Sequence, residues 1–486
     1  MSRRVLGPFN RVEGDLELSL DTEDGVVSAA RVNSPLYRGF EQILEGKAPA
    51  DALVIVPRIC GICSVSQSVA AATALADAMG VTPPPNGARA TNLMLATENL
   101  ADHLTHFYLF FMPDFARDAY AGAPWFASAE ARFKAIRGAA AADVLPTRAQ
   151  FMHLLGTLAG KWPHTLSVQP GGSARAVSAT ERVRMVALIR SFRAWLERHL
   201  FGDALEAISG IGSEAALWAW FDAKGPERGD FARFLGIARN LRLDRLGRCE
   251  GAERYLSHGN YVFEGERLFA RGVWDGASAS LLDFAHEDVT EDVSHAWMAG
   301  EGACHPLSGF TQPDIARESG YSWCKAPRWR GEVVQCGALS RQVVDAHPLA
   351  RDLVAAGGGN VFSRVVGRLL EIARVVPEME RWALAIEPGE RFCTEAGVPD
   401  SAQGVGLIEA ARGALGHWVV IRKGRIQRYQ IIAPTTWNFS PRDGRDTPGA
   451  LEQALVGTPA CESDEMPLAV QHVVRSFDPC MVCTVH

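Results

Sequence analysis

The sequence predicts an α+β protein in which long core helices dominate and small β-hairpins lie at the periphery. Residues 86–112 and 180–201 carry apolar residues every three or four positions, the pattern of a helix with one buried face. Residues 16–32 and 418–432 each contain two short strand-like runs on either side of a turn, the pattern of a hairpin. Neither a linker nor a repeat divides the chain, so we expect one domain over residues 1–486.

Taken in order, the first element is the hairpin of residues 16–32, with Glu13 at its entrance. A buried helix is expected to follow from Cys63 to residue 79, ended by Gly80. Cys63 would then lie near a helix N-terminus, where the helix dipole favours a thiolate.

The long helices come next. The helix of residues 86–112 is followed by that of residues 180–201, for which Thr180 is a plausible N-cap. A third helix is predicted over residues 363–376, and we expect Pro377 to end it, because proline cannot donate the helical hydrogen bond.

Two regions complete the order. Residues 255–274 carry strand-like runs, and residues 275–330 are rich in Gly, Trp and acidic residues without a clear period. We expect loops and short strands there, lying over the helical core. The hairpin of residues 418–432 turns at Lys423-Gly424.

Composition limits the class of protein. A chain that is 47% hydrophobic and 22% charged can bury a large core. The net charge of -7 and the absence of long basic runs argue against nucleic-acid or membrane-surface partners. The N-terminal arginines precede no apolar segment, and no stretch is long enough to span a bilayer. We therefore expect a cytoplasmic location and no membrane contact by this chain.

Two C-x-x-C pairs stand near opposite ends of the chain, Cys60/Cys63 and Cys480/Cys483. Each spacing lets two thiolates converge on one ion, so together they can supply four soft ligands. The common alternative is a structural zinc site, but zinc ribbons usually separate their pairs by roughly 15 to 20 residues. The remaining cysteines are expected to be free buried thiols: Cys249, Cys304, Cys324, Cys336, Cys393 and Cys461.

The surroundings of these pairs extend the interpretation, because motifs along essentially the whole chain resemble the large subunit of nickel-iron hydrogenases. In order they are Arg11-Val-Glu13-Gly14, Arg38-Gly39-Phe40-Glu41, Arg58-Ile-Cys60-Gly-Ile-Cys63, Ala411-Arg412-Gly413-Ala-Leu-Gly-His417-Trp418, Ala433-Pro-Thr-Thr-Trp437-Asn438 and Asp478-Pro-Cys-Met-Val-Cys483-Thr-Val-His486. The resemblance implies the large-subunit fold of that family, with a metal site built from both chain ends.

The resemblance also implies the metal centre. Nickel would be held by Cys60, Cys63, Cys480 and Cys483, and an iron carrying one carbonyl and two cyanide ligands would be bridged by Cys63 and Cys483. The chain has no further cysteine cluster. Iron-sulfur clusters would therefore belong to a separate small subunit that accepts the electrons.

Beside the metals the family places an arginine, which Arg412 matches, oriented by carboxylates that Asp102 and Asp478 match. A planar cation over the open face of the site could polarise dihydrogen. Taken alone, Asp102 could equally be an ordinary polar residue on the helix of residues 86–112.

Glu13 matches the proton-relay glutamate of the family. Burial and the thiolate of Cys480 would raise the pKa of this carboxyl, so that it could both accept and release a proton. The alternative for Glu13 is a salt bridge to Arg11.

A second, hard cation is implied at the other end of the chain. Glu41, a backbone carbonyl near Ile431 and His486 match ligands of magnesium, which takes oxygen ligands and keeps several waters. A terminal histidine is otherwise expected to be disordered. Its fixed distance in sequence from Cys483 favours the ligand interpretation.

Departures from the common pattern favour the regulatory, hydrogen-sensing branch. Gln67 and Asp15 stand where catalytic members often carry histidine, and an amide cannot change charge near neutral pH. Ile62 and Phe110 match gas-path positions that are bulky in regulatory members, although either could be a plain core residue. The chain stops at His486 without a C-terminal extension, although a sequence trimmed to its mature form would end in the same way.

The sequence therefore predicts an oxygen-tolerant hydrogenase that cleaves dihydrogen heterolytically and slowly. In the regulatory branch it would pair with a small subunit, form a dimer of such heterodimers and signal to a histidine kinase. One alternative is an uptake hydrogenase that serves respiration. A more remote alternative is a non-catalytic protein with a zinc clasp, which the retention of all four cysteines opposes.

Overall fold

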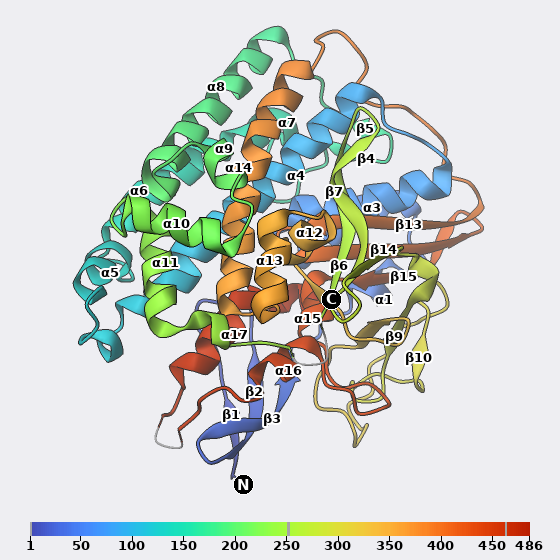
Figure 1. Ribbon diagram of the computed structural model, residues 1–486. Helices are drawn as coiled ribbons and strands as arrows, with labels where there is room; N and C mark the ends of the chain where they lie inside the picture. Colours follow the sequence, from blue (N-terminus) through green and yellow to red (C-terminus); the bar gives the residue numbers. More distant parts are fainter. Residues whose placement is uncertain (1, 250–252, 462–463) are drawn as a thin grey trace.

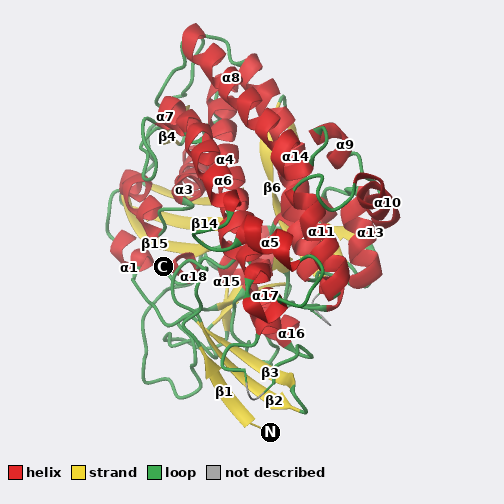
Figure 2. Ribbon diagram, turned by 90° about the vertical axis from the view of Figure 1, so that its left-hand side faces the viewer, coloured by secondary structure: helices red, strands yellow, loops and turns green. Residues whose placement is uncertain are grey.

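The computed structural model describes residues 2–249, 253–461 and 464–486. Long helices occupy one end of the molecule, and the N-terminal sheet lies at the other (Figure 1). The C-terminus lies inside the molecule rather than at its edge (Figure 2), and His486 is only 5% exposed. The main apolar core includes residues from both chain ends, from Leu6 to Cys483.

Three long helices form the centre of the helical part: α4 (Pro85–Thr105), α8 (Ala179–Trp195) and α14 (Val361–Ala385). α14 packs against both α4 and α8. The predicted helices over 86–112 and 180–201 are confirmed, although each ends in a π-helical turn, His106–Phe111 and Leu196–Phe201.

Two details of these helices differ from the prediction. The N-cap of α8 is Ser178, not Thr180, because its side chain accepts from Glu181 N–H and completes a capping box. α14 does not end at Pro377 but continues to Ala385. Its buried side chains beyond the proline, among them Met379 and Trp382, stabilise the helix enough to offset the lost hydrogen bond.

Helix α3 (Ser64–Met79) begins directly after Cys63 and ends at Gly80, as predicted. It packs against strand β13 (Ser401–Ala410), which the sequence did not predict. Gly404 and Gly406 lower the strand propensity of this segment, but their lack of a side chain allows α3 to approach closely. A Cβ at either glycine would lie about 2 Å from a backbone carbonyl oxygen of α3.

The predicted hairpins belong to small sheets, and the predominantly helical α+β class is confirmed. β2 (Glu17–Glu23) and β3 (Val26–Asn33) form an antiparallel sheet with β1 (Ser2–Leu6). β14 (Gly413–Arg422) lies between β13 and β15 (Arg425–Ile432), antiparallel to both. The other strands are β4 (Val168–Gln169), β5 (Gly172–Ser173), β6 (Arg254–Phe263), β7 (Glu266–Asp275), β8 (Ser280–Leu282), β9 (Val289–Asp292), β10 (Ala303–Cys304), β11 (Ala326–Trp329) and β12 (Gln335–Cys336).

Short helices connect and cover these elements. None of the helices in the described part of the chain is long and apolar enough to cross a membrane. The remaining helices are α1 (Phe40–Leu44), α2 (Ala52–Ile55), α5 (Phe126–Phe133), α6 (Ala139–Phe151), α7 (His153–Ala159), α9 (Leu205–Ser209), α10 (Glu214–Lys224), α11 (Asp230–Leu241), α12 (Ala338–Val344), α13 (Pro348–Gly357), α15 (Pro434–Asn438), α16 (Ala450–Leu455), α17 (Leu468–Phe477) and α18 (Met481–Thr484).

Candidate metal centre

The two cysteine pairs meet in the interior. The Sγ atoms of Cys60, Cys63, Cys480 and Cys483 all lie within 4.8 Å of one another, and all four residues are buried. The Sγ atoms of Cys63 and Cys483 are 3.1 Å apart, and those of Cys60 and Cys480 are 3.5 Å apart. Four converging sulfur donors fit a soft metal ion.

The other cysteines are free thiols, as expected. Their predicted burial is right for Cys249, Cys324 and Cys336 and wrong for the exposed Cys304 and Cys461, while Cys393 is half-buried. These three lie in loops or short strands, where the sequence has no period from which burial could be read.

The first pair is positioned by the start of α3. Cys63 is the N-cap residue of this helix. The carboxylate of Glu98, on α4, accepts from the backbone N–H groups of Val65 and Ser66, both at 2.8 Å, and from Trp162 Nε1 at 2.9 Å. Glu98 therefore satisfies donors that a helix start leaves free, and it ties α4 to the segment beside Cys63.

The second pair stands on the short helix α18 and is held by other segments. Cys480 N–H donates to Thr435 Oγ1 at 3.0 Å, and Met481 N–H donates to the carbonyl of Glu13 at 2.7 Å. Arg38 connects the two pairs, because it donates to the carbonyls of Ile59 and Val482. Each of these carbonyls directly precedes a cysteine.

Arg412 lies between β13 and β14 and meets both of its predicted partners. Its Nη1 is 2.9 Å from Asp102 Oδ2 and its Nη2 is 3.2 Å from Asp478 Oδ1. Burial raises the pKa of Asp102 to about 7, against the effect of Arg412. Burial also acts to raise the pKa of Asp478, but Arg412 and further positive groups, Arg368 among them, together lower it. Arg412 also lines a cavity of about 10 Å³ together with Cys63, Cys480 and Cys483.

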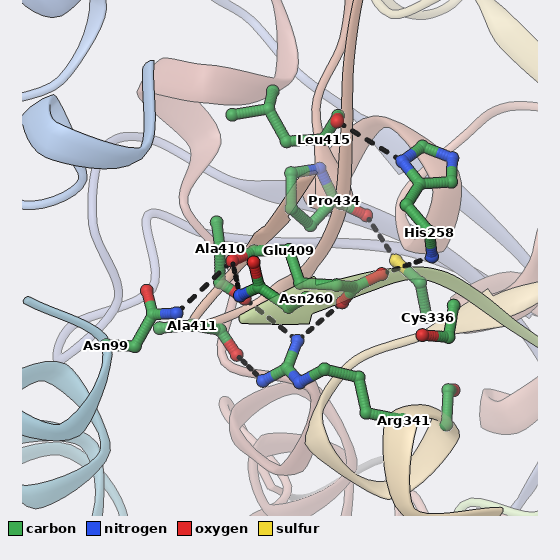
Figure 3. A network of polar contacts seen from close by, with 12 residues as sticks. Asn99, His258, Asn260, Cys336, Arg341, Glu409, Ala410, Ala411, Leu415 and Pro434 are labelled. Carbon is green, nitrogen blue, oxygen red and sulfur yellow. Dashed lines mark hydrogen bonds and ion pairs between the residues drawn. The ribbon is translucent and has the colours of Figure 1, made fainter. Parts of the chain in front are cut away.

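A buried arginine that the sequence did not single out supports this segment (Figure 3). Arg341 donates to the carbonyls of Ala410 and Ala411, at 2.8 and 3.0 Å, directly before Arg412. It also pairs with Glu409 at 2.6 Å and with Glu371 at 2.8 Å. No sequence motif marks Arg341, because its partners are distant in sequence and its own segment carries no metal ligand.

Glu13 is half-buried beside the cysteines. Burial raises its pKa, the negative charge of the Cys60 thiolate raises it further, and Arg412 acts in the opposite direction. Its backbone forms a β-bridge with Cys480. The alternative partner Arg11 instead pairs with Asp114, so the structure does not show the salt bridge considered from the sequence.

Glu41, Ile431 and His486 also converge. His486 Nε2 lies 2.8 Å from the carbonyl oxygen of Ile431 and 3.3 Å from Glu41 Oε1. Burial would raise the pKa of Glu41, but the nearby Lys325 and His486 lower it to about 2. A carboxylate, a carbonyl and an imidazole at one point fit a small divalent cation. The terminal histidine is thus packed rather than disordered.

The remaining predicted residues differ in their positions. Gln67, on α3, directs its amide nitrogen at Cys483 Sγ over 3.9 Å. Ile62 and Phe110 are half-buried, and neither is among the residues that line the cavity beside the cysteines. Asp15 is exposed.

Comparison with known proteins gives consistent results. A family model described as nickel-dependent hydrogenase matches residues 38–121 and 237–486. The large subunit of the periplasmic [NiFeSe] hydrogenase of Desulfomicrobium baculatum is 29% identical, over 99% of this chain and 94% of that protein. The hydrogenase-2 large chain of Escherichia coli K12 is 27% identical, over 100% and 97%.

Solved structures agree with these matches. The reduced, active form of the Ni-Fe-Se hydrogenase from Desulfomicrobium baculatum superposes with a TM-score of 0.85 at 26% identity, over the full length of both chains. The reduced Ni-Fe-Se hydrogenase from D. vulgaris Hildenborough superposes with a TM-score of 0.83 at 28% identity, again over both full chains. The similarity therefore extends over the whole chain.

Proposed function

The chain belongs to the nickel-dependent hydrogenase family, whose members are oxidoreductases acting on dihydrogen, and from this premise we propose that it is the large subunit of a regulatory, hydrogen-sensing member. The proposed catalytic role rests on one observation: four buried cysteine sulfurs converge beside the buried Arg412. We propose a single domain over residues 1–486, since one apolar core joins both chain ends.

Cys60 and Cys480 would bind nickel alone, and Cys63 and Cys483 would bridge nickel to an iron with one carbonyl and two cyanide ligands. When bound, this centre supplies the site at which dihydrogen is cleaved heterolytically to protons and electrons. Arg412, held by Asp102 and Asp478, keeps a fixed positive charge beside the cysteines. The surrounding burial excludes bulk water.

Glu13 would carry the proton away. Its raised pKa, caused by burial and the thiolate of Cys60, suits a group that both takes up and releases a proton. Cys480, whose backbone pairs with that of Glu13, is the proposed port on the sulfur side. We expect Glu13→Gln to abolish hydrogen-deuterium exchange while nickel and iron contents stay unchanged; normal exchange would refute the role.

Magnesium would bind to Glu41, the Ile431 carbonyl and His486. Their mutual approach and the low pKa of Glu41 support this assignment. Lys325 and Glu291 lie beside them, 3.0 Å apart, and would contact the waters of the ion.

The regulatory assignment rests on particular side chains. Gln67 cannot ionise, and the bulky Ile62 and Phe110 would restrict oxygen on a gas path. In this role the chain would work in the cytoplasm with an iron-sulfur small subunit, as a dimer of heterodimers that signals to a histidine kinase. An uptake hydrogenase remains the second candidate, because the matched relatives include the uptake hydrogenase large subunit of Rhodobacter capsulatus.

Metal analysis and infrared spectroscopy test the centre. Nickel and iron with carbonyl and cyanide bands would support it, whereas zinc alone would refute it and favour a structural clasp.

Turnover in air tests the regulatory role. A sensor should react slowly and keep its activity in air, and Ile62→Val with Phe110→Leu should make it oxygen-sensitive. Fast turnover, or an unchanged oxygen response in the double variant, would favour the uptake enzyme.

A further inference from the structure

A line of buried side chains leads from strand β15 to the bridging sulfur. Tyr429 OH lies 2.8 Å from His417 Nδ1, and His417 Nε2 lies 2.9 Å from Gln67 Oε1. The amide nitrogen of Gln67 then lies 3.9 Å from Cys483 Sγ. All four side chains are buried, so water cannot replace any of these contacts.

At the Tyr429 end of this line, the phenol determines which atoms donate hydrogen bonds and which accept them. The Tyr429 phenol is fully buried, so the proton of its hydroxyl must be donated to a partner within the protein. Among the described residues, its one hydrogen-bond partner is His417 Nδ1. Nδ1 therefore carries no proton. An imidazole whose Nδ1 accepts a hydrogen bond carries its single proton on Nε2, so Nε2 donates to Gln67 Oε1, 2.9 Å away.

The sulfur of Cys483, at the other end of the line, requires the same direction of hydrogen bonding. A metal-bound thiolate can accept a hydrogen bond but cannot donate one. The amide of Gln67 must therefore turn its nitrogen toward Cys483 and its oxygen toward His417. Two independent constraints, a phenol that must donate and a sulfur that must accept, thus select one tautomer and one amide orientation.

We propose that Tyr429 and His417 are positioning residues that hold the Gln67 amide as a permanent hydrogen-bond donor to the bridging sulfur of Cys483. The proposal rests on the proposed function, because it takes this sulfur to be a metal-bound thiolate. A donor at a ligand sulfur withdraws electron density from the metals. Since the donating amide does not ionise near neutral pH, this effect stays constant where an ionisable donor would vary.

Nitrogen-15 NMR of the purified complex with labelled histidine tests the direction without reference to the metals. The His417 signals, identified by their loss in His417→Phe, should show a protonated Nε2 and an unprotonated Nδ1. A protonated Nδ1 would overturn the proposal. This measurement needs no variant to bind metal, so it remains decisive if the nickel-iron assignment fails.

Infrared spectra of the carbonyl band test the effect at the metals. In Tyr429→Phe the amide is no longer held in one orientation, so the sulfur gains electron density and the band should move to lower wavenumber. Gln67→Leu, which removes the donor, should move it further. Tyr255→Phe, at another fully buried tyrosine that touches none of these residues, should leave the band in place. A normal carbonyl band that is unmoved in both Tyr429→Phe and Gln67→Leu would refute the proposal, whereas the absence of any such band in the wild type would refute the proposed function.

Discussion

A buried glutamate lies near each cysteine pair, Glu98 near the first and Glu41 near the second. Neutral hydrogen-bond donors surround Glu98, whereas Glu41 lies beside a positively charged lysine. Glu98 contacts the segment after Cys63 and accepts from neutral groups, the N–H groups of Val65, Ser66 and Trp162 and the hydroxyl of Ser66. Glu41 contacts His486, three residues after Cys483, and lies 3.7 Å from the ammonium of Lys325.

The charges of the two groups differ accordingly. Burial raises the pKa of Glu98 to about 7, although its donors oppose this. At Glu41 the nearby cations overcome burial, and the pKa falls to about 2. Hydrogen bonds from neutral groups therefore do not hold down the pKa of Glu98, whereas Lys325 and His486 together lower the pKa of Glu41. Glu98 thus supports the helix start after the first cysteine pair, whereas Glu41 belongs to a cluster of buried charges beside the terminal His486.

The largest effect is expected from Lys325→Met. It would leave Glu41 and Glu291 buried without their cation, which should cost about 3 to 5 kcal/mol. Urea unfolding of the apoprotein would measure this loss. Lys47→Met, at an exposed lysine, is the matched control and should change little. A loss no larger than that of the control would mean that the charge cluster does not stabilise the folded protein.

Glu98→Ala should come next, with a loss of about 3 kcal/mol, because it leaves buried N–H donors without an acceptor. The loss should be accompanied by faster hydrogen exchange at the start of α3, measured by mass spectrometry. Glu318→Ala, at an exposed glutamate, serves as the control. Unchanged exchange at residues 64–68 would show that Glu98 does not hold this helix start.

The pH dependence of Glu98 is smaller for each pH unit, because it is spread over a range of pH. Its carboxyl keeps a proton up to about pH 7 in the folded protein but only to about 4.5 when unfolded. Its contribution to stability is thus complete below pH 4.5 and is lost as the pH rises to 7, by about 1.4 kcal/mol per pH unit. Unfolding of the wild type and of Glu98→Gln should be compared across this range. Parallel curves would contradict the raised pKa.

The smallest effect is expected from Ser66→Ala, which removes one hydroxyl donor to Glu98, 2.9 Å away. The loss should be about 1 kcal/mol in the wild type and close to zero in Glu98→Ala, as a double-mutant cycle would report. Equal losses in both backgrounds would show that the hydroxyl acts independently of Glu98.

Several local elements could be predicted because their patterns are complete within a few residues. α3 follows from an apolar run that ends at Gly80, and the β14–β15 hairpin from its Lys423-Gly424 turn. The extent of α14 could not be predicted, since packing of residues beyond Pro377 outweighs the proline. Strand β13 was not predicted because Gly404 and Gly406 lower its strand propensity, although the same glycines allow close contact with α3.

By itself the sequence determined the chemistry of the donors: two cysteine pairs, Arg412 with its two carboxylates, and the Glu41 and His486 pair. Only the tertiary structure decided which residues hold these donors in place and which of the donors are ionised. Glu98, Arg341 and the line from Tyr429 to Cys483 act through contacts between residues far apart in the chain. Burial and neighbouring charge, which set each pKa and each tautomer, arise only when those distant segments meet.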